Sequence, residues 1–135
     1  MVLVDTSVMI NYLKGVLNDK TDTLQKIIDQ RIPYSISPYT YQEVLQGARN
    51  EAEFAQLKAY FSTLRIIFLP DDIKTYERAA RLFFDLRRNG VTIRSTIDIL
   101  IALTAIENEL SLLHDDRDFD LFSEKIAALK VLRIL

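Results

Sequence analysis

Residues 1–8, MVLVDTSV, contain the pattern on which the fold prediction depends. The aliphatic run Val2–Val4 has the composition of a short buried strand. It ends at Asp5, after which two hydroxyl residues lead into Ser7–Lys14, where apolar residues recur at helical spacing. The chain therefore opens as a buried strand that passes directly into a helix.

The same alternation continues along the chain. Further strands are predicted from short runs rich in β-branched and aliphatic residues: Tyr34–Ile36, Arg65–Leu69, Ser111–Leu113 and Val131–Ile134. Periodicity and capping signals predict helices over residues 23–30, 38 to about 49, 50–61, 72–89 and 97–109. Strands that alternate with helices predict an α/β fold, a three-layer sandwich with a mostly parallel central sheet flanked by helices.

Composition limits what this fold can be used for. At 135 residues, with 49% hydrophobic and 27% charged residues, the chain fits a single globular domain over 1–135. The absence of cysteine excludes disulfides, zinc ribbons and iron–sulfur clusters, and a single histidine excludes a histidine-rich metal site. With no long apolar run and no signal-peptide pattern, we expect a soluble cytoplasmic protein with no membrane contact. A net charge of −2 excludes a strongly basic nucleic-acid binder but leaves room for a local basic patch.

Four acidic residues follow predicted strands or begin predicted helices, namely Asp5, Glu43, Asp98 and Asp116. Each has an ordinary explanation. Asp5 could cap a helix, Glu43 could be an exposed helical residue, and Asp98 stands three residues after Ser95, the spacing of a capping box. Asp116 could belong to a turn and helix cap. Together, however, the predicted fold would converge all four on the carboxyl edge of the sheet, where sites form in open parallel sheets.

Clustered carboxylates raise one another's pKa unless a cation compensates. Hard divalent cations prefer oxygen ligands, so the predicted cofactor is Mg²⁺ or Mn²⁺, held by carboxylates of this cluster. Such a site suits phosphoryl chemistry, because the cation activates water and neutralises charge on the phosphate. Aspartyl-phosphate chemistry fits less well, since haloacid-dehalogenase-like phosphatases need a second Asp where this chain has Ser7.

At these residues the chain resembles a known family. The segments Val2–Val8, Glu43–Gly47, Asp98–Ala102 and His114–Phe119 are similar to the four ordered motifs of PIN-domain ribonucleases, and the length and layout most resemble VapC-type toxins of toxin–antitoxin pairs. The resemblance implies a parallel sheet between helices and the catalytic acids Asp5, Glu43, Asp98 and Asp116. It also implies that Thr6 helps to hold the water shell around the metal.

One position departs from the family pattern. The last motif usually begins with Thr or Ser two residues before its acid, and here His114 stands there. We expect His114 to be a hydrogen-bonded residue at the rim of the pocket. Asp116 matches the fourth acid best, and Asp118 is the secondary candidate.

A nuclease must also hold the phosphate backbone of its substrate. Arg94, just before the Asp98 segment, is the first candidate for RNA binding, followed by Arg87 and Arg88 at the end of the predicted long helix. The alternative is a solvated helix end, because arginine is favoured there by the helix dipole.

With this resemblance, the prediction is a metal-dependent endoribonuclease, the toxin of a toxin–antitoxin pair. Asp5, Asp98 and Asp116 are the expected ligands of Mg²⁺ or Mn²⁺, directly or through water, and Glu43 is expected to help orient the attacking water. The resemblance implies three partners: an RNA substrate, a cognate protein antitoxin and a second copy of the chain in a homodimer. Two alternatives remain, a PIN-type RNA-processing nuclease that is not a toxin, and a non-enzymatic interaction module whose acids only cap helices.

Overall fold

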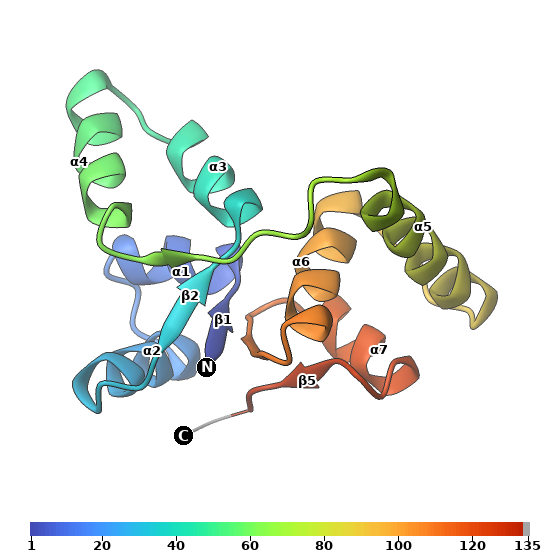
Figure 1. Ribbon diagram of the computed structural model, residues 1–135. Coiled ribbons are helices and arrows are strands. Elements are labelled where there is room, and N and C mark those ends of the chain that lie inside the picture. The colour runs from blue at the N-terminus through green and yellow to red at the C-terminus, as the bar shows by residue number, and fades with distance from the viewer. Residues whose placement is uncertain (134–135) are drawn as a thin grey trace.

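In a computed structural model that describes residues 1–133, the chain forms a parallel sheet between layers of helices (Figure 1). Within these residues there are five strands: β1 Val2–Val4, β2 Tyr34–Ile36, β3 Arg65–Ile66, β4 Ser111–Leu113 and β5 Lys130–Val131. The seven helices of the same range are α1 Thr6–Leu13, α2 Asp19–Asp29, α3 Pro38–Gln46, α4 Glu51–Phe61, α5 Ile73–Arg88, α6 Thr96–Glu107 and α7 Arg117–Lys125. The predicted fold class is confirmed.

All four strand pairings are parallel, and the strand order across the sheet is β3-β2-β1-β4-β5. The chain moves outward from β1 to β3 and then returns to the opposite side of β1 with β4. The order therefore reverses between β1 and β4, which register Val4 against Leu113. Residues that follow these two strands lie at the switch point of the sheet, where open α/β folds place their sites.

Alternation along the strands divides the apolar side chains between two cores. Leu3 and Leu112 face a core built with α5, α6 and α7, whereas Val4 and Leu113 face a core built with α1, α2, α3 and α4. Because successive strand residues point to opposite faces, three-residue strands suffice to join both helical layers. In Figure 1, α3 and α4 rise above the upper ends of β1 and β2, while α5 lies outside α6.

Several predicted boundaries differ from the structure. The predicted strand Arg65–Leu69 ends at Ile66, because β2 ends at Ile36 and no strand within residues 1–133 pairs with the chain beyond this point. The last strand is Lys130–Val131, so it begins one residue earlier than the predicted Val131–Ile134 and ends before Leu132, while Ile134 lies outside the described residues.

Helix ends differ for local reasons. α2 begins four residues before the predicted Thr23, because Asn18 and Thr21 form a capping box that the prediction missed. α3 stops at Gln46, about three residues before its predicted end. α7 was predicted only as a turn with a helix cap, and its cap is Asp116. No helix within residues 1–133 has both the length and the apolar character needed to cross a bilayer.

Two helix starts allow a test of capping. Asn50 accepts a hydrogen bond from the Glu53 N–H at 2.8 Å, whereas the Ser95 side chain forms no capping hydrogen bond at the start of α6. Asn50→Ala should therefore lower the free energy of unfolding by about 1 kcal/mol, and Ser95→Ala by less than about 0.5 kcal/mol. Urea unfolding of the metal-free variants measures both values. An equal loss in the two would mean that Ser95 caps α6 in solution.

Candidate metal centre

Asp5 stands at the end of β1 and is both a helix cap and a buried acid. Its backbone N–H donates to the Leu113 carbonyl at 2.9 Å, which fixes it beside the end of β4. Its Oδ2 accepts hydrogen bonds from the Ser7 N–H at 3.1 Å and the Ser7 hydroxyl at 2.6 Å. Only 4% of Asp5 is exposed. The capping explanation is thus correct, yet it does not account for a carboxylate buried at the switch point, where burial raises its pKa.

Glu43 reaches the same region from α3 and is oriented by hydroxyl groups. The Thr6 hydroxyl donates to Glu43 Oε1 at 2.7 Å, and Thr6 Oγ1 lies 3.0 Å from Thr40 Oγ1. Thr40 is fully buried near the start of α3. Glu43 is therefore held through one oxygen by a residue that follows β1, rather than extending freely from its helix.

The carboxylates of Asp98, Asp116 and Asp118 form a triad in which one oxygen of each lies within 4.8 Å of the others. Asp98 comes from the first turn of α6, and the other two come from the start of α7. Oxygen donors at this spacing fit a hard divalent cation such as Mg²⁺ or Mn²⁺. Of the three predicted ligands, Asp98 and Asp116 therefore lie together in the triad. The third member of the triad is Asp118 rather than Asp5.

Electrostatics link the triad with the remaining acids. Burial raises the pKa of Asp98 to about 7, and the negative charges of Asp5, Asp116, Glu43 and Asp118 add to this rise. The five carboxylates therefore lie close enough together for their charges to interact. Ser95 makes no capping hydrogen bond in the described chain, so a capping box does not explain Asp98.

The three candidate RNA-binding arginines have different surroundings. Arg94 Nη2 lies 3.3 Å from Asp118 Oδ1, and the Asp118 side chain is 5% exposed while that of Arg94 is 70% exposed. Arg87 and Arg88 lie over the rings of Phe83 and Phe84, at 5.7 Å and 5.4 Å from guanidinium carbon to ring centroid. Arg94 is thus the one of the three that contacts the acidic cluster.

His114 follows the last residue of β4 and is buried and hydrogen-bonded. Its Nδ1 accepts a hydrogen bond from the Asp116 N–H at 3.0 Å. Its ring packs against Phe119 at 5.2 Å between centroids, and burial lowers the pKa of the imidazole.

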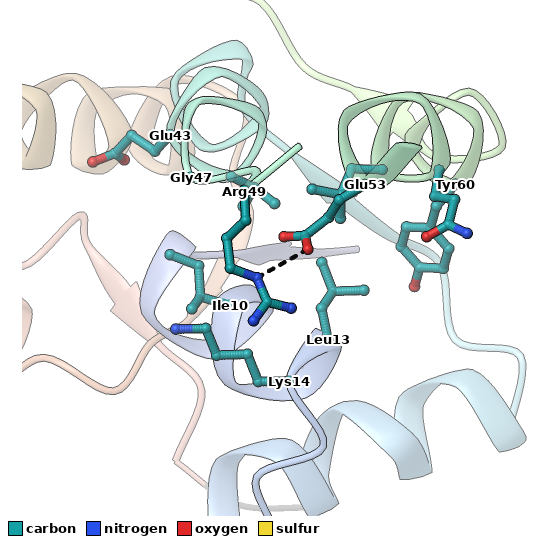
Figure 2. Close-up of a pocket in the computed structure, with 11 residues that line it drawn as sticks. Ile10, Leu13, Lys14, Glu43, Gly47, Arg49, Glu53 and Tyr60 are labelled. Carbon is teal, nitrogen blue, oxygen red and sulfur yellow. Dashed lines mark hydrogen bonds and ion pairs between the residues drawn. The ribbon is translucent and has the colours of Figure 1, made fainter. Parts of the chain in front are cut away.

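A groove of about 760 Å³ lies between α1, α3 and α4, with Glu43 at one edge (Figure 2). Its floor includes the apolar side chains of Ile10 and Leu13 from α1. Figure 2 shows Arg49 in an ion pair with Glu53, 3.1 Å from Nε to Oε2, and the Glu43 carboxylate turned away from that pair. The groove thus joins an apolar surface to one end of the acidic cluster.

A parallel sheet with carboxylates converged at its switch point defines an α/β protein with an acidic edge, whose oxygen donors have a spacing that fits a cation. Residues 2–125 match the family model described as PIN domain, which covers most of the chain. The chain belongs to the PIN domain family.

Individual relatives agree with this membership. The chain is 27% identical over 124 residues to ribonuclease VapC11 of Mycobacterium tuberculosis, covering 91% of this chain and 92% of that protein. Its fold is similar to that in a crystal structure of VapBC2 from Rickettsia felis bound to a promoter DNA fragment, with TM-score 0.75, 20% identity and 98% of each chain covered. A toxin–antitoxin complex from Klebsiella pneumoniae is similar at TM-score 0.70 and 22% identity, over 97% of this chain and all of that one.

Ser7 is a site residue whose role the sequence prediction missed. Its hydroxyl donates to Asp5 and accepts a hydrogen bond from the Asp115 N–H at 2.9 Å. It therefore ties the loop after β4 to the acid after β1. The hydroxyl pair after Asp5 was a visible signal, but a hydroxyl two residues after an acid is also an ordinary capping pattern.

The raised pKa of Asp98 predicts how the stability of the metal-free protein depends on pH. The folded protein binds the Asp98 proton up to about pH 7, while the unfolded chain releases it near the ordinary pKa of 3.8. Between these values the folded state binds more protons, so the Asp98 contribution to stability falls as pH rises from about 4 to 7 and is constant above.

Asp98→Asn removes this titration, so its stability should fall less than that of the wild type across the same window. Urea unfolding in a chelator at several pH values measures the difference, and subtraction of the two curves removes the contribution of other groups such as His114. Exposed Glu77 on α5 provides the control variant Glu77→Gln. Parallel curves for the wild type and Asp98→Asn would contradict the raised pKa.

Proposed function

We propose that the chain is a metal-dependent endoribonuclease and the toxin of a toxin–antitoxin pair. The observation that carries the proposal is the convergence of five carboxylates on the switch point, three of them with oxygens within 4.8 Å of one another. Membership of the PIN domain family and similarity to a protein named ribonuclease VapC11 support the choice of RNA as substrate.

Asp98, Asp116 and Asp118 would hold the cation, and Asp5 would add its charge beside Asp98. When bound, Mg²⁺ or Mn²⁺ supplies charge neutralisation on the phosphate and activation of water. Glu43 would help to orient the attacking water, with its carboxylate fixed by the hydrogen bond that Thr6 donates to Oε1. The residues of the chain thus divide into those that bind the cation and one that orients the nucleophile.

Arg94 supports substrate binding. Its guanidinium is exposed and yet in contact with Asp118, so it can contact a phosphate that approaches the cluster. A cation held by Asp118 would reduce the attraction between this carboxylate and Arg94, which favours contact of the guanidinium with RNA. Arg87 and Arg88 remain weaker candidates because their guanidinium groups lie over aromatic rings of their own helix.

A protein antitoxin is the proposed partner, since the chain is similar in fold to chains of toxin–antitoxin complexes. The groove between α1, α3 and α4 suits an amphipathic segment: its apolar floor leads to Glu43, and its lining also carries Lys14 and the Arg49–Glu53 ion pair. Exposed apolar side chains before and along α5, Phe68, Ile73 and Tyr76, support a homodimer.

Asp5→Asn tests the nuclease assignment, because it removes one charge of the cluster while keeping the shape of the side chain. RNA cleavage with saturating Mn²⁺ should fall more than about 100-fold, beyond the usual cost of losing an outer-shell partner of a metal site. The rise in Tm on adding Mn²⁺ to the metal-free protein should also shrink. Glu77→Gln should leave both measurements unchanged.

A folded Asp5→Asn protein that still cleaves RNA at the wild-type rate would refute the assignment. A wild-type Tm that does not respond to Mn²⁺ would favour the alternative of an interaction module whose acids only cap helices.

Arg94→Ala tests the substrate contact. RNA affinity should fall, and the slope of log affinity against log salt should become shallower by about one phosphate contact. Binding is measured in the Asp5→Asn background so that the RNA stays intact, with Arg65→Ala, exposed at the first residue of β3, as the matched control. Mn²⁺ affinity should not fall, because Arg94 competes for Asp118. An unchanged salt slope would show that Arg94 serves only as the partner of Asp118.

A further inference from the structure

His114 is held in a single orientation by contacts on both edges of its ring and on its face. It is 2% exposed and stands between β4 and the acids that open α7. Phe119 packs against the ring at 5.2 Å between centroids. None of the roles assigned to the acidic residues accounts for a buried imidazole at this position.

The Nδ1 edge determines which nitrogen carries the proton. A backbone N–H can only donate, so the hydrogen bond of 3.0 Å from Asp116 N to His114 Nδ1 requires a lone pair on Nδ1. The neutral ring must then carry its proton on Nε2.

The Nε2 edge faces a carboxylate. His114 Nε2 lies 3.2 Å from Asp120 Oδ1, although the contact lacks the alignment of a hydrogen bond, and Nε2 has no other partner among the described residues. Arg133 Nη1 also lies 3.2 Å from Asp120 Oδ1. The negative charge of Asp120 therefore favours a proton on Nε2 and so leaves Nδ1 as an acceptor.

The hydrogen bond at His114 Nδ1 fixes the backbone segment that carries Asp116 and Asp118, two of the three acids of the triad. His114 holds the Asp116 N–H, and Asp116 Oδ1 in turn accepts from the Asp118 N–H at 2.9 Å. The neighbouring Asp115 N–H donates to Ser7. Three backbone N–H groups between residues 115 and 118 are thus held by hydrogen bonds. The imidazole of His114 is the acceptor for the N–H of Asp116.

We propose that His114 is a positioning residue of the cation site: as the neutral Nε2–H tautomer, it holds the Asp116 backbone so that the carboxylates of Asp116 and Asp118 meet that of Asp98. In the resembling family a hydroxyl residue usually stands at this position, and the imidazole nitrogen takes the acceptor role here. The inference rests on the proposed function only in that a divalent cation binds to the triad.

The tautomer can be observed directly. His114 is the only histidine of the chain, so ¹H–¹⁵N correlation spectra of the tag-free, metal-free protein contain a single imidazole and need no assignment by mutation. We expect the pattern of a neutral ring protonated at Nε2 in the wild type. A ring protonated at Nδ1, or at both nitrogens at pH 8, would overturn the proposal.

Two variants separate positioning from space filling. His114→Asn retains an acceptor near the position of Nδ1, whereas His114→Leu fills the apolar site without one. We expect Mn²⁺ affinity, measured by calorimetry, to fall about tenfold or more in His114→Leu and to stay within about threefold of the wild type in His114→Asn. RNA cleavage at low Mn²⁺ should follow the same order, and saturating Mn²⁺ should restore much of it in His114→Leu.

The outcomes distinguish this inference from the proposed function. Equal Mn²⁺ affinities in His114→Leu and His114→Asn, with the wild type binding normally, would overturn the positioning role alone. A wild type that binds no Mn²⁺ would overturn the cation site and the role of His114 with it. If His114→Leu does not fold, the tautomer in the wild type and the affinity of His114→Asn still decide: a large loss in His114→Asn would contradict the acceptor role.

Discussion

The parallel pairing of β1 with β4 is the constraint on which the site depends. Val4 is registered against Leu113, and the Asp5 N–H continues the ladder to the Leu113 carbonyl at 2.9 Å. This pairing joins the first strand of the chain to one more than 100 residues later, at the point where the strand order reverses. The polar residues that follow the two strands meet for this reason, and α3 and α6 add their acids to the same edge.

The cluster that results works against the stability of the metal-free fold. Five carboxylates share one edge, and burial together with mutual repulsion raises the pKa of Asp98 to about 7. Local hydrogen bonds offset part of this cost: Ser7 donates twice to Asp5, and Thr6 donates to Glu43. Such an arrangement is expected where function needs a cation, because the charge that destabilises the empty site is the charge that binds the metal.

Much of this could be predicted from residue patterns. The runs Val2–Val4 and Ser111–Leu113 are typical of buried strands, and their alternation with helical segments predicted the parallel α/β fold. The acids could be located because they stand immediately after strands or at helix starts. The early end of β3 at Ile66 could not be predicted, because the length of a strand depends on its neighbour in the sheet and β2 is short.

The sequence by itself therefore determined the fold class, the family resemblance and the set of acids that belong to one edge. Only the tertiary structure decided which oxygens lie together: it grouped Asp118 rather than Asp5 with Asp98 and Asp116. It also placed Arg94 beside Asp118 and the Nδ1 of His114 within hydrogen-bond distance of the Asp116 N–H. The physical reason is the distance along the chain over which each kind of interaction acts. Strand and helix patterns are local and repeat along the chain, whereas the distance between two carboxylates depends on how separate elements pack.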